Sequence, residues 1–290
     1  GYGPQCPVVR DVAEALPLGG QVLVLGMAPS GGRLPTYMLE EVDRAIDGGL
    51  SVINGLHEPL TDRYPKLNAG QWIWDIRQEP KDLGIASARA CSLDNRRLLI
   101  VGTDMAIGKM TSGIEIWRES LRRGIQSEFL ATGQIGICVS GRGIPLDAIR
   151  VDYACGAVER MVMDAADAEL QVIEGQGSIM HPGSTSTLPL LRGSCPTHLV
   201  LCHRAGSDKL ADHDISVPRL SELITLYEDI ASACGGFPRP KTIGIALNPS
   251  SLGKDDAREA IVRFSKETSL PVVDPIRGDV KLLVDALFDD

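Results

Sequence analysis

The chain has 290 residues and is 43% hydrophobic, which is enough for one large domain or two ordinary domains. A formal net charge of -9 and a pI near 5.1 argue against nucleic acid and anionic membrane surfaces as partners. The seven cysteines form no CxxC pair, and no apolar run approaches the ~20 residues of a membrane span. We therefore expect a soluble protein of the reducing cytoplasm.

Two α/β units follow one another along the chain. Residues 21–27 and 51–56 are strand-like and enclose a helical pattern near 35–47, which predicts a βαβ unit. The first residues lack the strand and glycine turn that open a Rossmann half, so we expect this domain to be truncated at its start. We assign residues 1–94 to this smaller Rossmann-like domain.

A second series of strands begins at residue 96. In THLVLCH and KTIGIALN, two of its strand-like runs, the apolar residues are almost uninterrupted, which is typical of parallel strands covered by helices on both faces. We therefore predict an α/β fold with a doubly wound parallel sheet over residues 95–290.

The stretch GTDMAIGKMTS, residues 102–112, lies between the strand-like LLIV and a helical segment. Five residues separate its two glycines where a Walker loop has four, and methionine follows the lysine where Ser or Thr is usual. Backbone N–H groups of such a loop, backed by a helix N-terminus, form a cradle for a phosphate. The second domain is therefore predicted to be P-loop NTPase-like. The predicted cofactor-binding residues are Gly102, Thr103, Met105, Ala106, Ile107, Gly108, Lys109, Met110 and Thr111.

Three more glycine-containing turns end strands of the second unit: ATGQIGI, IEGQGSIMHPG and LCHRAG. Because the carboxyl ends of parallel strands line one crevice, we expect these turns to converge on the P-loop. The residues that they bring to the crevice are Gln134, Glu174, Gln176, Ser178, His181 and His203. We expect His203, which ends a buried strand, to be structural, and leave His181 open between a structural and a functional role.

Two turns of the first unit also carry polar side chains after strands. Arg33 lies in SGGRLP, and His57 with Glu58 lies in GLHEPL. We predict that Arg33 and His57 contact substrate, although simple turn or surface roles stay open for both. The spacing G-x-G-x-x-G is absent, which disfavours a nicotinamide-dependent dehydrogenase.

The five-residue gap and the Gly-Thr-Asp start resemble dethiobiotin synthetase and its relatives. This resemblance implies an alternative function, an ATP- and Mg-dependent ligase or kinase, with Thr111, Asp152 and Glu174 around the metal. In the opposing interpretation, Asp152 caps its helix and Glu174 accepts backbone N–H bonds. Met110 argues against the metal site, because it displaces the expected hydroxyl by one residue.

Seven motifs taken together resemble one family: APSGGRLP, GLHEPL, VGTDMAIGKMTS, ATGQIGI, DYACGAVERMV, EGQGSIMHPG and VLCHRAG. It is a former domain-of-unknown-function family whose characterised members are D-glutamate N-acetyltransferases of the DgcN type, and the likeness spans nearly all of residues 20–280. The resemblance implies a P-loop domain behind a smaller Rossmann-like domain. It also implies acetyl transfer from acetyl-CoA to the amine of D-glutamate, and the preference for the D-enantiomer comes from the resemblance alone.

Acetyl transfer of this kind sets clear chemical requirements. The P-loop would hold the CoA pyrophosphate, and a base must remove a proton from the substrate ammonium group. The predicted catalytic residues are Asp104, Glu174 and His181 as candidate bases and Lys109 as a candidate oxyanion donor; Gln134, Gln176 and Ser178 are predicted to contact the amino acid. Arg204, like Arg33, is a candidate for binding a carboxylate of the glutamate substrate. Cys138 and Cys202 are minor candidates for a covalent acetyl carrier. We also predict a homo-oligomer, and a non-catalytic metabolite sensor stays an open alternative.

Overall fold

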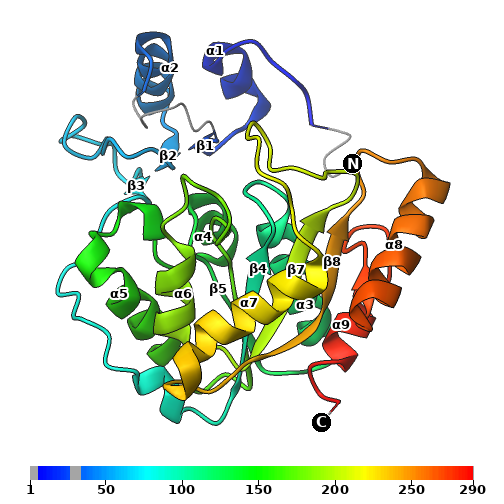
Figure 1. Cartoon of the computed structure of the whole chain (residues 1–290). Helices are drawn as coiled ribbons and strands as arrows, with labels where there is room; N and C mark the ends of the chain where they lie inside the picture. The colour runs from blue at the N-terminus through cyan, green and yellow to red at the C-terminus, as the bar shows by residue number, and fades with distance from the viewer. Residues whose placement is uncertain (1–5, 27–33, 290) are drawn as a thin grey trace. The chain divides into compact units, whose positions relative to one another are not determined.

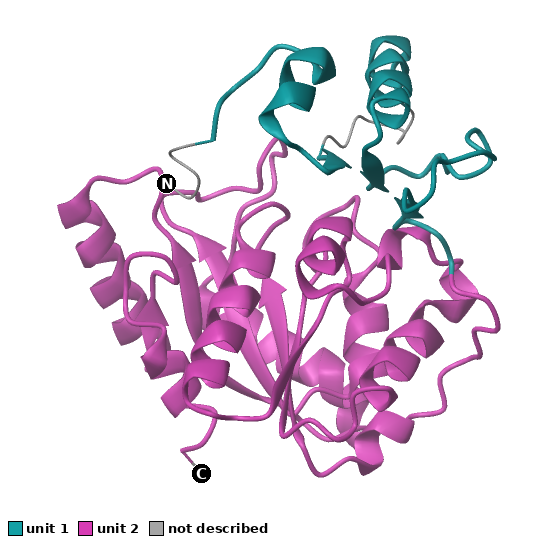
Figure 2. Cartoon of the chain, turned by 180° about the vertical axis from the view of Figure 1, so that it is seen from behind, with its two compact units in different colours: residues 1–79 teal, residues 80–290 magenta. Residues whose placement is uncertain are grey.

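The computed structural model describes residues 6–26 and 34–289. Contacts within the chain divide it into two compact units, residues 1–79 and 80–290 (Figure 2). This division comes earlier in the chain than the boundary predicted after residue 94. The reason is that residues 87–89 belong to the second unit, where the buried carboxylate of Glu159 accepts hydrogen bonds from the backbone N–H groups of Ser87 and Arg89. Within the described residues, no helix has the length and apolarity needed to cross a membrane.

The first unit is built on a parallel sheet in the order β1-β2-β3, with residue pairs Val22–Ser51 and Val52–Ile73 in register. The predicted βαβ unit is confirmed, since β1 and β2 are joined by the amphipathic helix α2. Val42 and Ile46 of that helix pack with Leu25 and Val52 of the strands. The elements of this unit are α1 (Val12–Ala15), η1 (Leu16–Leu18), β1 (Val22–Leu25), α2 (Thr36–Asp47), β2 (Ser51–Asn54) and β3 (Ile73–Asp75).

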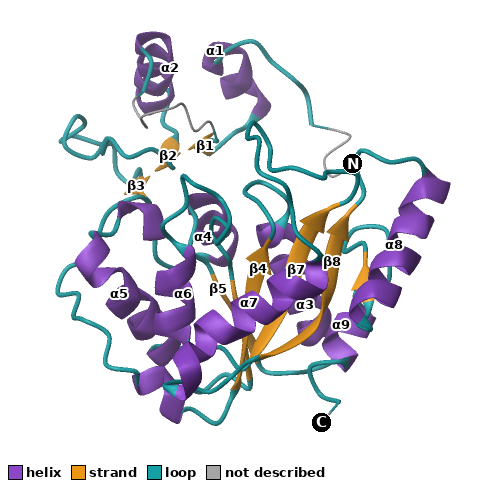
Figure 3. Cartoon of the chain, viewed as in Figure 1, coloured by secondary structure: helices purple, strands orange, loops and turns teal. Residues whose placement is uncertain are grey.

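The second unit contains a parallel sheet in the order β5-β6-β4-β7-β8-β9, of which Figure 1 labels β5, β4, β7 and β8. Helices cover both of its faces, and Figure 3 shows α7 in front of the strands and α3 behind them. The strands are β4 (Arg96–Gly102), β5 (Ser127–Leu130), β6 (Leu170–Ile173), β7 (His198–Arg204), β8 (Lys241–Asn248) and β9 (Val272–Val273). The main helices are α3 (Lys109–Arg122), α4 (Gln134–Ser140), α5 (Val151–Met163), α6 (Thr187–Ser194), α7 (Leu220–Ser232), α8 (Lys254–Thr268) and α9 (Lys281–Asp285), joined by the short turns η2 (Arg89–Ser92), η3 (Leu146–Ala148) and η4 (Ala233–Gly235). This arrangement confirms the predicted doubly wound α/β fold.

Strand order decides where a ligand can bind in this unit. β4 pairs with β6 on one side and with β7 on the other, so the chain leaves β4 at the point where the order reverses. Ligands of open α/β sheets bind at the carboxyl ends of such strands. The fold therefore places the P-loop beside the turns that follow β6 and β7.

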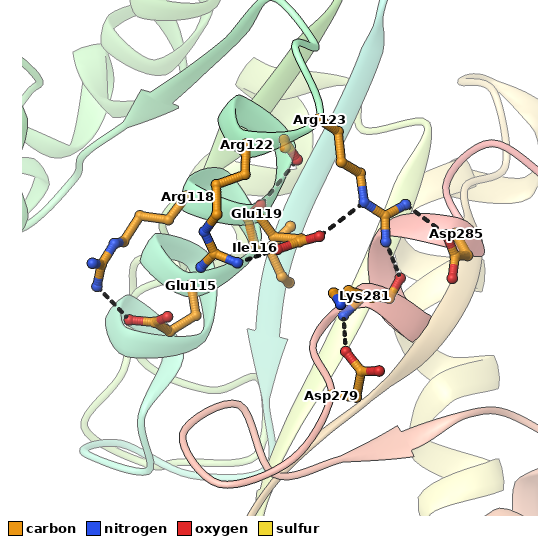
Figure 4. Close-up of polar contacts among 10 residues, drawn as sticks. Glu115, Ile116, Arg118, Glu119, Arg122, Arg123, Asp279, Lys281 and Asp285 are labelled. Atoms are coloured by element: carbon orange, nitrogen blue, oxygen red, sulfur yellow. Dashed lines mark hydrogen bonds and ion pairs between the residues drawn. The ribbon is translucent and has the colours of Figure 1, made fainter.

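The far end of α3 is tied to the C-terminal helix α9 by a small ionic network (Figure 4). Glu119 is only 3% exposed, and its carboxylate pairs with both Arg122 and Arg123. Arg123 also pairs with Asp285 and donates a hydrogen bond to the carbonyl of Lys281. Because α3 begins at the P-loop, this network stabilises the helix that supports the loop without touching the loop itself.

Candidate functional site

The P-loop has the predicted order of strand, loop and helix. β4 ends at Gly102, and α3 begins at Lys109 after a loop with two left-handed residues, Ala106 (φ 52°) and Gly108 (φ 108°). A side chain at position 108 would be strained, which explains the second glycine of the motif. A Cβ at position 102 would lie 2.9 Å from Ile107 Cδ1, which explains the first.

Carbonyl groups of this loop are held by side-chain donors from three elements. Lys109 Nζ donates to the carbonyl of Asp104 at 2.7 Å, and Arg204 Nη2 donates to the carbonyl of Ala106 at 2.7 Å. Asn248 Nδ2 donates to the carbonyl of Ile107 at 3.2 Å. In contrast, the backbone N–H groups of residues 106–111 donate to no acceptor within the described part of the chain. The loop therefore offers a run of unused donors at a helix N-terminus, as an anion site requires.

Lys109 is buried beside this run of donors and is 7% exposed. Burial lowers the pKa of its ammonium group, and the nearby Cys202, Asp104 and Glu174 act in the opposite direction. A Cβ at Gly175 would lie 1.6 Å from the carbonyl oxygen of Ile100 and 3.2 Å from Lys109 Cδ. The glycine after Glu174 is therefore needed for close packing of β4, the lysine side chain and the turn after β6.

Glu174 follows β6 directly and is 3% exposed. Its Oε2 accepts hydrogen bonds from the backbone N–H groups of Thr132 at 2.8 Å and Gly133 at 3.1 Å. Burial raises the pKa of this carboxyl group to about 7, although the two N–H groups and Lys109 favour its ionised form. The expected hydrogen bonds to backbone are thus present, but they come from the turn after β5. A carboxyl group with a pKa near 7 can exchange a proton at neutral pH, as a general base must.

Space around this carboxylate is kept by two glycines. A Cβ at Gly136 would lie 2.4 Å from Glu174 Oε2, and a Cβ at Gly133 would lie 2.5 Å from Gln176 Nε2. Gln176 therefore extends over the turn after β5, next to Glu174. Gln134 is the first residue of α4 in the same turn and is half-buried.

His181 is buried in the turn after β6, and its ring has a defined hydrogen-bonding state. Nδ1 accepts the backbone N–H of Gly183 at 3.0 Å, so the neutral ring carries its proton on Nε2. The ring also makes an edge-to-face contact with His213 at 4.7 Å between centroids. In this state His181 is a hydrogen-bond donor rather than a base.

Asp104 and Ser178 have their polar atoms engaged by backbone groups. Asp104 accepts from Met105 N and Ala211 N, both at 2.7 Å, and so anchors the loop that follows β7 to the P-loop. Ser178 is buried, and its Oγ accepts from Met180 N at 3.2 Å. Both residues hold backbone segments in place around the crevice.

A residue that the sequence did not single out for this site is Tyr227 of α7. Its hydroxyl donates to the carbonyl of Gly102 at 2.7 Å and accepts from Ile179 N at 3.1 Å. Sequence analysis had no reason to separate it from the apolar face of its helix. The available signal was its hydroxyl, because a buried tyrosine normally needs a partner.

The residues around β7 have structural roles. His203 Nδ1 lies 3.1 Å from Thr103 Oγ1, its ring contacts Phe264 edge to face, and burial with the nearby Arg263 lowers its pKa to about 4. Arg204 holds the P-loop carbonyl described above. Burial raises the pKa of the Cys202 thiol to about 11 and also raises that of Cys138, so neither is an activated nucleophile.

The three residues predicted around magnesium have different surroundings in the structure. Asp152 is exposed in the first turn of α5, Thr111 is half-buried in α3, and Glu174 binds backbone N–H groups. In residues 6–26 and 34–289, no group of three or more His, Cys, Asp or Glu side chains is placed to hold a metal ion. The set of Thr111, Asp152 and Glu174 around a magnesium ion stays a prediction.

The substrate residues predicted in the first unit are only partly described. Arg33 lies outside the described residues. His57 is exposed in the turn after β2, and the Asp75 carboxylate fixes that turn through the N–H groups of Leu60 and Thr61, both at 2.9 Å. The carbonyl of Glu58 accepts a hydrogen bond from Asn54 Nδ2 at 2.8 Å.

Comparison with known proteins gives the same two-part organisation. A family described as "Domain of unknown function (DUF1611_N) Rossmann-like domain" matches residues 2–79, and "Domain of unknown function (DUF1611_C) P-loop domain" matches residues 84–284. A crystal structure of a DUF1611 family protein from Anabaena variabilis matches with a TM-score of 0.93 at 47% identity, covering 98% of this chain and 84% of that chain.

Two curated relatives are both named D-glutamate N-acetyltransferase. The protein from Pseudoalteromonas is 34% identical over 280 residues, and the protein from Tritonibacter scottomollicae is 35% identical over 283 residues. Each match covers 94% of this chain and 83% of the relative. The family resemblance inferred from the seven motifs is confirmed. The chain therefore belongs to the DUF1611 family, whose members combine a Rossmann-like domain with a P-loop domain.

Proposed function

We propose that this protein transfers the acetyl group of acetyl-CoA to the amine of D-glutamate. The observation that carries the proposal is the run of unused N–H groups at residues 106–111 next to a buried carboxyl group, Glu174, whose pKa is about 7. The first feature suits an anionic donor, and the second suits deprotonation of an amine. The names of the two curated relatives support the same reaction.

In the proposed mechanism, Glu174 is the general base. It accepts one proton from the substrate ammonium group, and the amine nitrogen then forms a bond to the thioester carbon. The carbonyl oxygen becomes an oxyanion, which Lys109 stabilises while the loop N–H groups hold the pyrophosphate; one such donor is worth roughly 3–4 kcal/mol. Collapse of this intermediate breaks the C–S bond, and the departing thiolate takes the surplus proton from nitrogen.

Other residues of the crevice have supporting roles in this proposal. His181 donates through Nε2–H to a substrate carboxylate or to the acetyl oxygen, because its Nδ1 is already occupied. Gln176 and Gln134 contact the amino acid from the turns around Glu174. Substrate contacts by Arg33 and His57 stay predictions for the first unit.

The cellular setting is also part of the proposal. All seven cysteines are free, which suits the reducing cytoplasm. Assembly into a homo-oligomer stays a prediction.

The decisive experiment measures release of free thiol from acetyl-CoA with D-glutamate, and identifies N-acetylglutamate by mass spectrometry. L-glutamate is the matched stereochemical control. Thiol release that needs neither ATP nor magnesium supports the proposal, and no thiol release with either enantiomer overturns it. The same loop donors would also suit a nucleotide phosphate, so an ATP- and Mg-dependent ligase or kinase is the second candidate. It requires ADP formation in the absence of acetyl-CoA.

A further inference from the structure

A cavity of about 160 Å³ adjoins the P-loop within the second unit. Gly108 of the loop and Thr111 of α3 form one wall. Asn248 at the end of β8 forms the second wall, and residues 274–276 after β9 form the third. Whole ligand pockets commonly measure roughly 300–1,000 Å³. This cavity therefore suits one ring system of a larger ligand whose phosphates occupy the neighbouring loop.

The polar group that distinguishes this cavity is the carboxylate of Asp274, which is only 7% exposed. Its Oδ1 accepts from the backbone N–H groups of Ile276 at 2.9 Å and Arg277 at 3.2 Å. Its Oδ2 accepts no hydrogen bond from the described residues. Oδ2 is not fully enclosed, so it is an acceptor that either water or the N–H group of a ligand can use.

The remaining walls favour a flat ring with a second polar edge. Ile107, Leu247 and Pro275 provide apolar surface, and Ile276 is 58% exposed at the rim. The Asn248 amide is held in one orientation, because Nδ2 donates to Ile107 O while Oδ1 accepts from Ser250 N at 3.1 Å. The second N–H of that amide is available to a ring nitrogen acceptor.

We propose that this cavity binds the adenine ring of the acetyl donor, with the exocyclic amino group donating to Asp274 Oδ2. Adenine presents an amino donor beside ring nitrogen acceptors, which matches the free carboxylate oxygen and the Asn248 amide. The pyrophosphate then lies over residues 106–111. This inference rests on the proposed function for the identity of the ligand.

The test compares ADP with IDP as competitors of acetyl-CoA, with binding also measured by calorimetry. The two nucleotides share ribose and pyrophosphate, but IDP has an oxygen in place of the adenine amino group. We expect ADP to bind about tenfold more tightly than IDP to the unmodified protein, as for loss of one hydrogen bond to a charged group. Asp274→Asn should bring this ratio close to one.

Asp279→Asn is the matched control: Asp279 lies in the same loop between β9 and α9, and its carboxylate also accepts a backbone N–H, that of Lys281, but it lies outside the cavity. It should leave the ratio unchanged. Ile276→Ala tests the stacking wall at an exposed position where misfolding is not expected, and should weaken both nucleotides several-fold without changing their ratio. Equal affinity for ADP and IDP in the unmodified protein, or an unchanged ratio in Asp274→Asn, overturns the inference. A preference for GDP over ADP also overturns it.

The two proposals fail in different ways. If the protein transfers acetyl groups but binds ADP and IDP equally well, the adenine site is refuted and the proposed function stands. If ADP binds more tightly than IDP in a way that depends on Asp274, but no thiol is released from acetyl-CoA, the adenine site stands and acetyl transfer is refuted.

Discussion

Replacing Glu174 by glutamine removes the proposed base while keeping the shape of the side chain. The amide oxygen of glutamine can still accept from Thr132 N and Gly133 N, which now hold Oε2. A general base contributes typically ~10²- to 10⁴-fold to rate, so kcat should fall by about that factor. The KM for acetyl-CoA should change little, because the residue does not belong to the loop that binds the donor.

The pH dependence follows from the same carboxyl group. Its folded pKa of about 7 lies above the ordinary value of 4.5 because burial disfavours the charged form. The unmodified enzyme should therefore gain activity as the pH rises toward about 7, since only the carboxylate accepts a proton. In Glu174→Gln this inflection should be absent.

Stability should change in the opposite direction. A raised folded pKa means that the contribution of Glu174 to stability is fully present below pH 4.5 and is lost as the pH rises through about 7. The full pKa shift corresponds to ~3 kcal/mol. We therefore compare the free energy of unfolding of Glu174→Gln with that of the unmodified protein by urea denaturation at pH 4 and pH 8. The difference should favour the variant more at pH 8 than at pH 4.

The assay records thiol release with D-glutamate and acetyl-CoA from pH 5 to pH 9, alongside unfolding of the same preparations. Residual activity within about tenfold of the unmodified enzyme would refute the role of Glu174 as the base. Loss of activity with unchanged pH dependence of stability would refute the stated cause of its raised pKa. The two readouts separate the catalytic argument from the electrostatic one.

Three further substitutions test other parts of the site. Lys109→Ala should lower kcat by about 10²- to 10³-fold, because the lysine stabilises the oxyanion; steady-state kinetics in which the KM for acetyl-CoA rises while kcat stays unchanged would show that the lysine only binds the donor phosphate. Tyr227→Phe should destabilise the protein by ~1–3 kcal/mol in urea denaturation, since the carbonyl of Gly102 loses its donor; a change below ~0.5 kcal/mol would show that this hydroxyl is dispensable. Arg123→Ala should lower the melting temperature by about 2–4 °C and leave kcat unchanged, because its ion pairs lie at the far end of α3; an altered kcat would mean that this end of the helix affects the site.

Much of the architecture followed from the sequence because its signals are local. The apolar runs of β4, β7 and β8 indicated strands covered on both faces, and the loop between Gly102 and Lys109 had the residues that a strand-to-helix turn needs. The convergence of turns after parallel strands is a property of the topology. The structure bears this out, because Glu174 after β6 binds the N–H groups of the turn after β5.

Hydrogen-bonding roles were less accessible because they depend on partners far away in the chain. Asp104 was a candidate base, yet one of its oxygens accepts from Ala211, more than a hundred residues later. His181 was ambiguous until the N–H of Gly183 defined the occupied ring nitrogen. Spacing along the chain indicates which residue types share a crevice, but the direction of each side chain depends on tertiary contacts.

The loop that carries the proposal is ordered before any ligand arrives. Its carbonyl groups at Asp104, Ala106 and Ile107 are bound by donors from α3, β7 and β8, so the loop conformation does not depend on the anion. Binding then has little backbone entropy to offset, and the fixed N–H groups need no reorganisation during the reaction. Among these three donors, Lys109 is the one whose charge acts on Glu174, and its ammonium group can exchange its carbonyl for a phosphate oxygen or an oxyanion. The positive charge of Lys109 favours the ionised form of Glu174. Movement of that charge on donor binding would therefore change the pKa of the carboxyl group, which couples donor binding to the basicity of Glu174.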